Sequence, residues 1–108
     1  PWYRSFLVTD PAADWAGVEA PILGIFGGND TQVPGARNEL ALRSAVAEGE
    51  RAELTTIILP AANHLFQAAE TGLVAEYRQL EDTFTPEFLP TLVEWVVVTV
   101  KEEGSDSR

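Results

Sequence analysis

Two short apolar runs, each bounded by turn-forming residues, predict two β-strands in this chain. Ile22–Phe26 is almost continuously apolar, follows Pro21 and ends at Gly27. An apolar run without polar alternation is typical of a strand that is covered on both faces, as in a parallel sheet. Leu54–Leu59 is rich in β-branched residues and is closed by Pro60, so it also predicts a strand.

The segment between these two runs predicts a helix. Ala36–Glu48 is rich in good helix formers, and Gly49 is a natural stop. A strand, a helix and a second strand in this order predict a parallel pair joined by a right-handed crossover. A helical turn is expected near Ala75–Leu80, whereas Pro1–Asp14 is too irregular to predict an element.

A last helix is predicted from Pro86 to about Val100. Thr85 offers a hydroxyl cap, the proline suits the first helical position, and an acid follows in the first turn. Apolar side chains recur at helical spacing: Phe88, Leu92, Trp95 and Val96. The pattern therefore predicts an α/β domain over residues 1–100, strand-helix-strand-helix with parallel strands flanked by helices, followed by a polar tail at 101–108.

Composition narrows the classes of partner. The 108 residues suffice for one domain, and a net charge of −10 argues against nucleic acid or an anionic membrane as partner. Without cysteine there are neither disulfides nor thiolate metal sites, and the apolar runs fall far short of the roughly 20 residues of a membrane span. Because the chain starts at Pro1 and lacks methionine, we expect a piece of a longer protein, which leaves its compartment open.

Two loops are the strongest candidates for a functional site. Asp30 follows the first predicted strand and Asn63-His64 follow the second. The carboxyl ends of parallel strands lie at one edge of a sheet, where function collects. A carboxylate that binds one imidazole nitrogen leaves the other nitrogen free to act as a general base. Taken singly, such an aspartate is typical of a turn and a lone histidine of a packing role, but their joint position favours a functional pair.

Other groups of residues favour structural roles. Gly27-Gly28 lacks the rest of a phosphate-binding motif and predicts a tight turn. A metal or cofactor site on Asp30, Asn63 and His64 is a weaker hypothesis, because one histidine and one acid rarely suffice. The acids of the last third lack metal-site spacing and indicate a solvated face: Glu76, Glu81, Asp82 and Glu87.

Two motifs occur in an informative order: Gly-x-x-Asp-x-x-Val-Pro within Pro21–Pro34 and Asn-His-x-Phe within Leu59–Gln67. Together they resemble the C-terminal part of an α/β-hydrolase, in the branch related to prolyl oligopeptidases and dienelactone hydrolases. The resemblance extends over about residues 1–100, with further matching pieces: Pro1-Trp2-Tyr3-Arg4, Thr71-Gly72, Glu76-Tyr77, Leu80–Thr83 and Trp95.

The resemblance implies a role for each loop. Asp30 corresponds to the acid and His64 to the base of a catalytic triad, in the chain order of that fold. Leu65 and Phe66 would then line the substrate site, with a small acyl substrate and no cofactor or metal. These roles are expectations that follow from the family and not from the spacing alone.

The nucleophile of such a triad should precede the acid, and no serine here fits. None of the serines is flanked as Gly-x-Ser-x-Gly after a strand: Ser5, Ser44, Ser105 and Ser107. We therefore expect the C-terminal fragment of a serine hydrolase, carboxylesterase-like, that is inactive alone. The alternative is a non-catalytic α/β domain that associates with itself through an exposed sheet edge, because a two-stranded sheet is marginal and its edges recruit partners.

Overall fold

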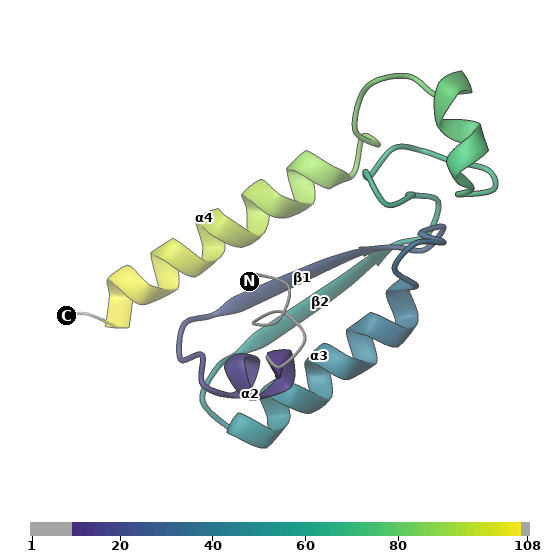
Figure 1. Ribbon diagram of the computed structural model, residues 1–108. Helices are drawn as coiled ribbons and strands as arrows, with labels where there is room; N and C mark the ends of the chain where they lie inside the picture. Colours follow the sequence, from purple (N-terminus) through teal and green to yellow (C-terminus); the bar gives the residue numbers. More distant parts are fainter. Residues whose placement is uncertain (1–9, 107–108) are drawn as a thin grey trace, which may run out of the picture.

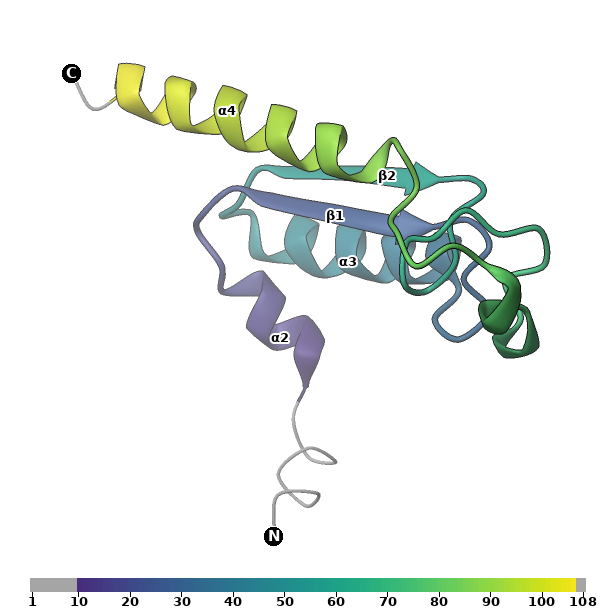
Figure 2. The ribbon, with the colours of Figure 1, turned by 90° about the horizontal axis from the view of Figure 1, so that it is seen from above.

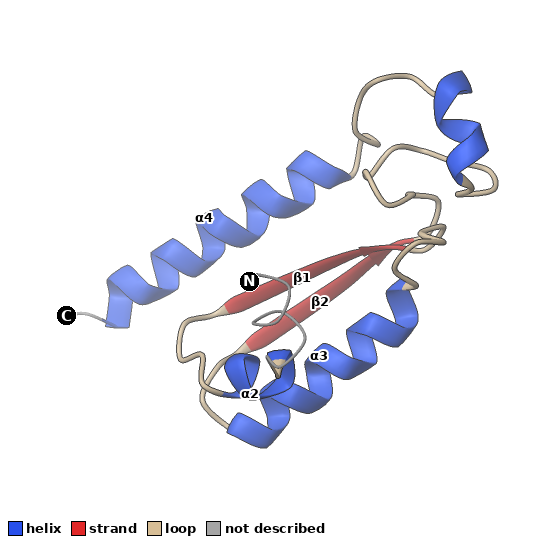
Figure 3. Cartoon of the chain, viewed as in Figure 1, coloured by secondary structure: helices blue, strands red, loops and turns tan. Residues whose placement is uncertain are grey.

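The computed structural model describes residues 10–106, which form a two-stranded parallel sheet flanked by helices (Figure 1, Figure 3). Strands β1 (Ile22–Gly27) and β2 (Leu54–Leu59) pair in register, with the first residues of the strands opposite each other and Gly27 opposite Leu59. Both predicted strands are confirmed, and the architecture is of the α/β kind.

The helices lie on both faces of this sheet. Helix α3 (Gly35–Gly49) connects the two strands and packs on one face beside the short helix α2 (Pro11–Ala16). Helix α4 (Phe88–Asp106) runs along the opposite face (Figure 2). A 3-10 helix, η1 (Val74–Gln79), falls where a helical turn was expected. Because β1 and β2 are parallel, their carboxyl ends lie at the same end of the sheet, and the loops that follow them lie there too.

Helix α2 was not predicted, although its start carries a clear signal. Asp10 accepts a hydrogen bond from the Ala12 N–H at 3.1 Å, and Pro11 occupies the first helical turn. An aspartate cap followed by proline is a recognised helix start. The remainder of the irregular opening segment, residues 1–9, lies outside the described residues.

Helix α3 ends one residue later than predicted, and for a different reason. Gly49 is its last helical residue, and the left-handed residue that follows is Glu50, with φ 53°. A Cβ atom on Gly49 would lie 2.0 Å from the carbonyl oxygen of Ala16. Glycine is thus required for the close approach of α2, not for the left-handed turn that ends the helix.

Helix α4 begins later than predicted. It starts at Phe88 rather than Pro86, because the preceding residues form a turn in which the Phe88 N–H donates to the carbonyl oxygen of Thr85 at 3.1 Å. The Thr85 hydroxyl donates to the Glu87 carboxylate. The hydroxyl therefore fixes the turn before the helix.

The other end of α4 also differs from the prediction. The helix continues past Val100 to Asp106, since the lysine and glutamates at the start of the expected polar tail are good helix formers. Its half-buried face includes three of the predicted apolar residues, but Val96 is 43% exposed. The three are Phe88, Leu92 and Trp95.

Few apolar side chains of the described residues are fully buried. They are Ile22, Ala45, Val46, Leu59, Ala62 and Ala69. The Cα radius of gyration is 16.2 Å, compared with about 13 Å for a compact domain of this length. Helix α4 leaves many apolar side chains exposed: Leu89, Val93, Val96, Val97, Val98 and Val100. The described residues therefore leave more apolar surface uncovered than a compact domain would.

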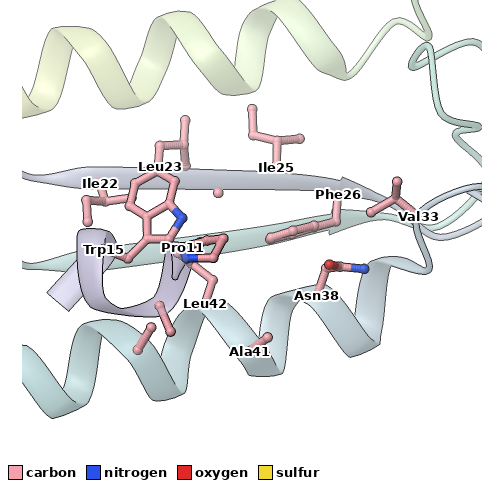
Figure 4. A pocket seen from close by; sticks show the side chains of 13 residues that line it. Pro11, Trp15, Ile22, Leu23, Ile25, Phe26, Val33, Asn38, Ala41 and Leu42 are labelled. Carbon is pink, nitrogen blue, oxygen red and sulfur yellow. The ribbon is translucent and has the colours of Figure 1, made fainter. Parts of the chain in front are cut away.

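Strand β1 carries apolar side chains on both faces. An open groove of about 470 Å³ between α2, β1 and α3 is lined by Trp15, Phe26 and Leu42, among others (Figure 4). In the same view, Leu23 and Ile25 point away from α3 and toward α4. This two-faced burial is what the continuous apolar run predicted.

Candidate functional site

The turn after β1 is fixed by close contact with the chain that leaves β2. The Gly28 N–H donates to the Leu59 carbonyl at 2.8 Å, and the Asn29 N–H donates to the Ala62 carbonyl at 2.9 Å. A Cβ atom on Gly28 would lie 2.5 Å from the Pro60 carbonyl oxygen. The two glycines after the apolar run therefore form a tight turn that brings the two loops together.

The loop after β2 is organised by Asn63, whose side chain is fully buried. Its Oδ1 accepts hydrogen bonds from the N–H groups of Leu65 and Gln67 at 2.9 and 3.0 Å, and its Nδ2 donates to the Gln67 side chain at 3.0 Å. Phe66 adopts a left-handed conformation, with φ 58°. This turn places His64 at its exposed tip.

Asp30 and His64 are brought into direct contact. The His64 Nδ1 atom lies 2.9 Å from Oδ2 of Asp30, although the two residues are 34 positions apart. The Asp30 side chain is 10% exposed and the His64 side chain 40% exposed. Within residues 10–106, His64 Nε2 has no hydrogen-bond partner. The imidazole is therefore held at one nitrogen and accessible at the other.

The hydrogen bonds around Asp30 favour its charged form. Partial burial alone would raise the pKa of Asp30, but the Val33 N–H, the His64 side chain and the Gln32 N–H outweigh this effect. The Val33 and Gln32 N–H groups donate to Oδ1 at 2.8 and 2.9 Å. The pKa of Asp30 is consequently below its ordinary value, and a charged carboxylate at this distance favours the tautomer of the ring with the proton on Nδ1.

The two residues predicted to line the substrate site lie in different environments. Leu65 is 49% exposed and lines an open pocket with Gln67, Asp82 and Phe84, among others. Phe66 is half-buried and stacks on Phe88, with ring centroids 4.4 Å apart. Leu65 is thus available to a ligand beside His64, whereas the ring of Phe66 packs against the start of α4.

The described residues offer little to a metal ion. The Oδ1 atom of Asn63 already accepts two hydrogen bonds, so this oxygen is not available as a metal ligand beside Asp30 and His64. Across residues 10–106, no three carboxylate or histidine side chains gather in a group that could hold a metal.

In the same part of the chain, no helix combines the length and apolar character that crossing a membrane requires.

The serines in the described part of the chain lie in helices α3 and α4, not in the loops of Asp30 and His64. Ser44 is exposed on α3, roughly 13 Å along the helix axis from its start at Gly35. Ser105 is in the last turn of α4, while Ser5 and Ser107 lie outside the described residues. Asp30 and His64 are therefore in contact with each other, and neither loop contains a serine among residues 10–106.

The sequence did not reveal which residues hold this pair in place. Asn63 and Glu76 both belong to pieces of the family resemblance, but neither was predicted to hold a loop of the site, as Asn63 does for the histidine loop. Comparisons with protein-family models, with curated proteins and with solved structures found no match for this chain.

Proposed function

We propose that Asp30 and His64 are the acid and the base of a serine-hydrolase active site, and that this chain is the C-terminal part of an α/β-hydrolase domain. The observation that carries the proposal is the 2.9 Å contact between His64 Nδ1 and Asp30, combined with an accessible Nε2. A charged carboxylate at Nδ1 selects the tautomer in which Nε2 can accept a proton from a nucleophile.

The topology supports the same proposal. The acid follows β1 and the histidine follows β2, both at the carboxyl ends of parallel strands. This is the place and the chain order of these two groups in α/β-hydrolases. The substrate would be a small ester or related acyl compound, and the serine and the oxyanion hole would come from residues before β1.

In such an enzyme the pair would act in two steps. His64 Nε2 takes the proton of the serine hydroxyl as the oxygen attacks the acyl carbon, and then gives that proton to the leaving group. Asp30 stabilises the imidazolium in between without taking the proton itself. Leu65, exposed beside the histidine, would contact the acyl or leaving group.

The test uses the natural reading frame that contains these residues. Hydrolysis of short p-nitrophenyl esters is measured for the wild type, His64→Ala, Asp30→Asn and the control Glu70→Gln, which removes an exposed carboxylate. We expect losses of about 10⁴-fold in kcat for the two site variants and full activity for the control. Unchanged turnover in His64→Ala would refute the proposal, as would a reading frame without a serine after an upstream strand.

A second candidate function is association through the sheet edge, which the two-stranded sheet favours. The Ile22 and Gly28 N–H groups both point toward β2, so the alternate N–H groups at Leu23 and Ile25 face the outer edge of β1. No strand among residues 10–106 covers that edge. An unpaired edge beside exposed apolar surface recruits a further strand.

Sedimentation velocity tests this second candidate on the chain itself. We expect self-association at micromolar concentration that strengthens with salt, because screening reduces the repulsion between copies of charge −10. Ile25→Pro removes an outer-edge donor without touching the ladder to β2, and it should weaken association. A monomer at all salt concentrations would exclude this candidate.

A further inference from the structure

The residues on both sides of Asp30 are bound by a distant stretch of chain. Residues 69–77, named the clamp segment, follow the histidine loop and include the start of η1. Asn29 Nδ2 donates to the Ala69 carbonyl at 2.7 Å, and Thr31 Oγ1 donates to the Gly72 carbonyl at 2.9 Å. The aspartate therefore sits between two side chains that are both tied to the clamp segment.

Two further contacts bring the clamp segment close to the same turn. Gln32 Nε2 donates to the Tyr77 hydroxyl at 2.9 Å. Gly72 has φ 73°, and a Cβ atom there would lie 1.7 Å from the Asn29 carbonyl oxygen. Only glycine permits this approach, so the contact depends on the path that the clamp segment takes.

That path is set by Glu76. Its carboxylate accepts three backbone hydrogen bonds, from Glu70 and Thr71 to Oε2 at 3.0 and 3.1 Å and from Gly72 to Oε1 at 3.1 Å. Burial acts to raise the pKa of Glu76, but the N–H groups of Thr71, Gly72 and Glu70 lower it on balance. The peptide groups whose N–H groups bind Glu76 include the carbonyls of Ala69 and Glu70, to which Asn29 Nδ2 donates at 2.7 and 3.4 Å. The Gly72 carbonyl, which Thr31 binds, lies one peptide group further along the same turn.

We propose that Glu76 is a positioning residue, which acts through the clamp segment to hold Asp30 Oδ2 against His64 Nδ1. A role of Glu76 in catalysis rests on the proposed function, but its effect on the contact between Asp30 and His64 can be measured in this chain without any substrate. If the carboxylate of Glu76 is replaced by a neutral amide, one of its two acceptor oxygens becomes a donor and the remaining hydrogen bonds lose their charge. The clamp segment then holds the residues that flank Asp30 less firmly.

The test is the tautomer of His64, read from its ring ¹⁵N chemical shifts. The chain has one histidine, so the signals are unambiguous, and at about pH 8.5 an ordinary imidazole is neutral. In the wild type we expect the proton on Nδ1. In Glu76→Gln the ratio of the Nε2–H to the Nδ1–H tautomer should rise about threefold or more, the effect of weakening one hydrogen bond. Glu70→Gln, which makes the same charge change within the clamp segment, should leave the ratio as in the wild type.

A second variant keeps the test decisive if Glu76→Gln does not fold. Thr31→Val removes one hydrogen bond to Gly72 and keeps the side-chain shape, and it should shift the tautomer ratio in the same direction. The proposal is overturned if folded Glu76→Gln matches Glu70→Gln, or if Thr31→Val matches the wild type. A wild type with the proton on Nε2 would instead overturn the contact between Asp30 and His64, and with it the proposed function.

Discussion

Gly27, the last residue of β1, packs so closely on the loop after β2 that a Cβ atom on it would lie 2.7 Å from the carbonyl oxygen of Asn63. The same Cβ would lie 2.5 Å from the carbonyl oxygen of Ala62. Since these residues directly precede the turns that carry Asp30 and His64, the contact sets the spacing between the two candidate site residues.

Gly27→Ala is therefore expected to destabilise the fold and to separate the two loops. A methyl group forced against two carbonyl oxygens costs about 1–3 kcal/mol of unfolding free energy, as overpacking does elsewhere. Urea denaturation measures this loss. Gly17→Ala is the matched control, because its Cβ would make only ordinary contacts, the nearest at 3.5 Å. Equal losses in the two variants would show that the loops do not depend on this approach.

Asn63→Ala is expected to lower the unfolding free energy more than truncation of any other Asn or Gln side chain in the two site loops. It leaves the part-buried N–H groups of Leu65 and Gln67 without their acceptor, at up to about 1–3 kcal/mol for each group that water cannot reach. The urea midpoint should fall accordingly. Asn38→Ala, which removes a single exposed hydrogen bond to Pro34, provides the comparison and should fall much less.

The lowered pKa of Asp30 makes part of the stability depend on pH. A carboxyl group with a folded pKa below its unfolded value of about 3.9 stabilises the fold above that pH and loses this contribution as the pH falls through the folded pKa. Asp30→Asn should therefore reduce the unfolding free energy most above about pH 5, and its deficit relative to the wild type should shrink toward acid. Urea unfolding over a series of pH values tests this, and a deficit that grows on acidification would contradict it.

Strand pairing was accessible from sequence because it depends on local pattern. Continuous apolar character in Ile22–Phe26 and β-branching in Leu54–Leu59 each predict a strand. The helix between them predicts a crossover that joins parallel strands, as the structure has them. Once they are parallel, their carboxyl ends must share an edge. The proximity of Asp30 and His64 therefore follows from topology rather than from any property of the two residues.

The supports of the site were not accessible in the same way. Glu76 acts on backbone N–H groups, and Asn29 and Thr31 act on backbone carbonyls, so no pattern of side-chain types reveals these contacts. Gly49 was predicted as the stop of the helix, but it is the last helical residue, and the approach of α2 that requires glycine there is a tertiary contact. Such contacts depend on the path of the chain in space, which periodicity does not describe.

Aromatic rings pack at the junction between the histidine loop and α4. Phe88 stacks on Phe66 at 4.4 Å and contacts the ring of Phe84 at 4.7 Å, and the Thr85 N–H donates to the Phe66 carbonyl at 2.7 Å. Because these contacts hold Phe66 in its left-handed conformation, which a residue with a Cβ atom adopts only at a cost, the ring of Phe88 supports the loop that carries His64.

Phe88→Ala should therefore lower the unfolding free energy by about 1–3 kcal/mol, through lost apolar burial and lost ring stacking. It should also broaden the NMR signals of the His64 ring, since the loop would then sample other conformations. Leu89→Ala is the control one position along the helix, where the side chain is 51% exposed, and it should change stability by less than about 0.5 kcal/mol. Equal stability of the two variants, together with sharp His64 signals, would show that the ring of Phe88 does not hold the histidine loop in its conformation.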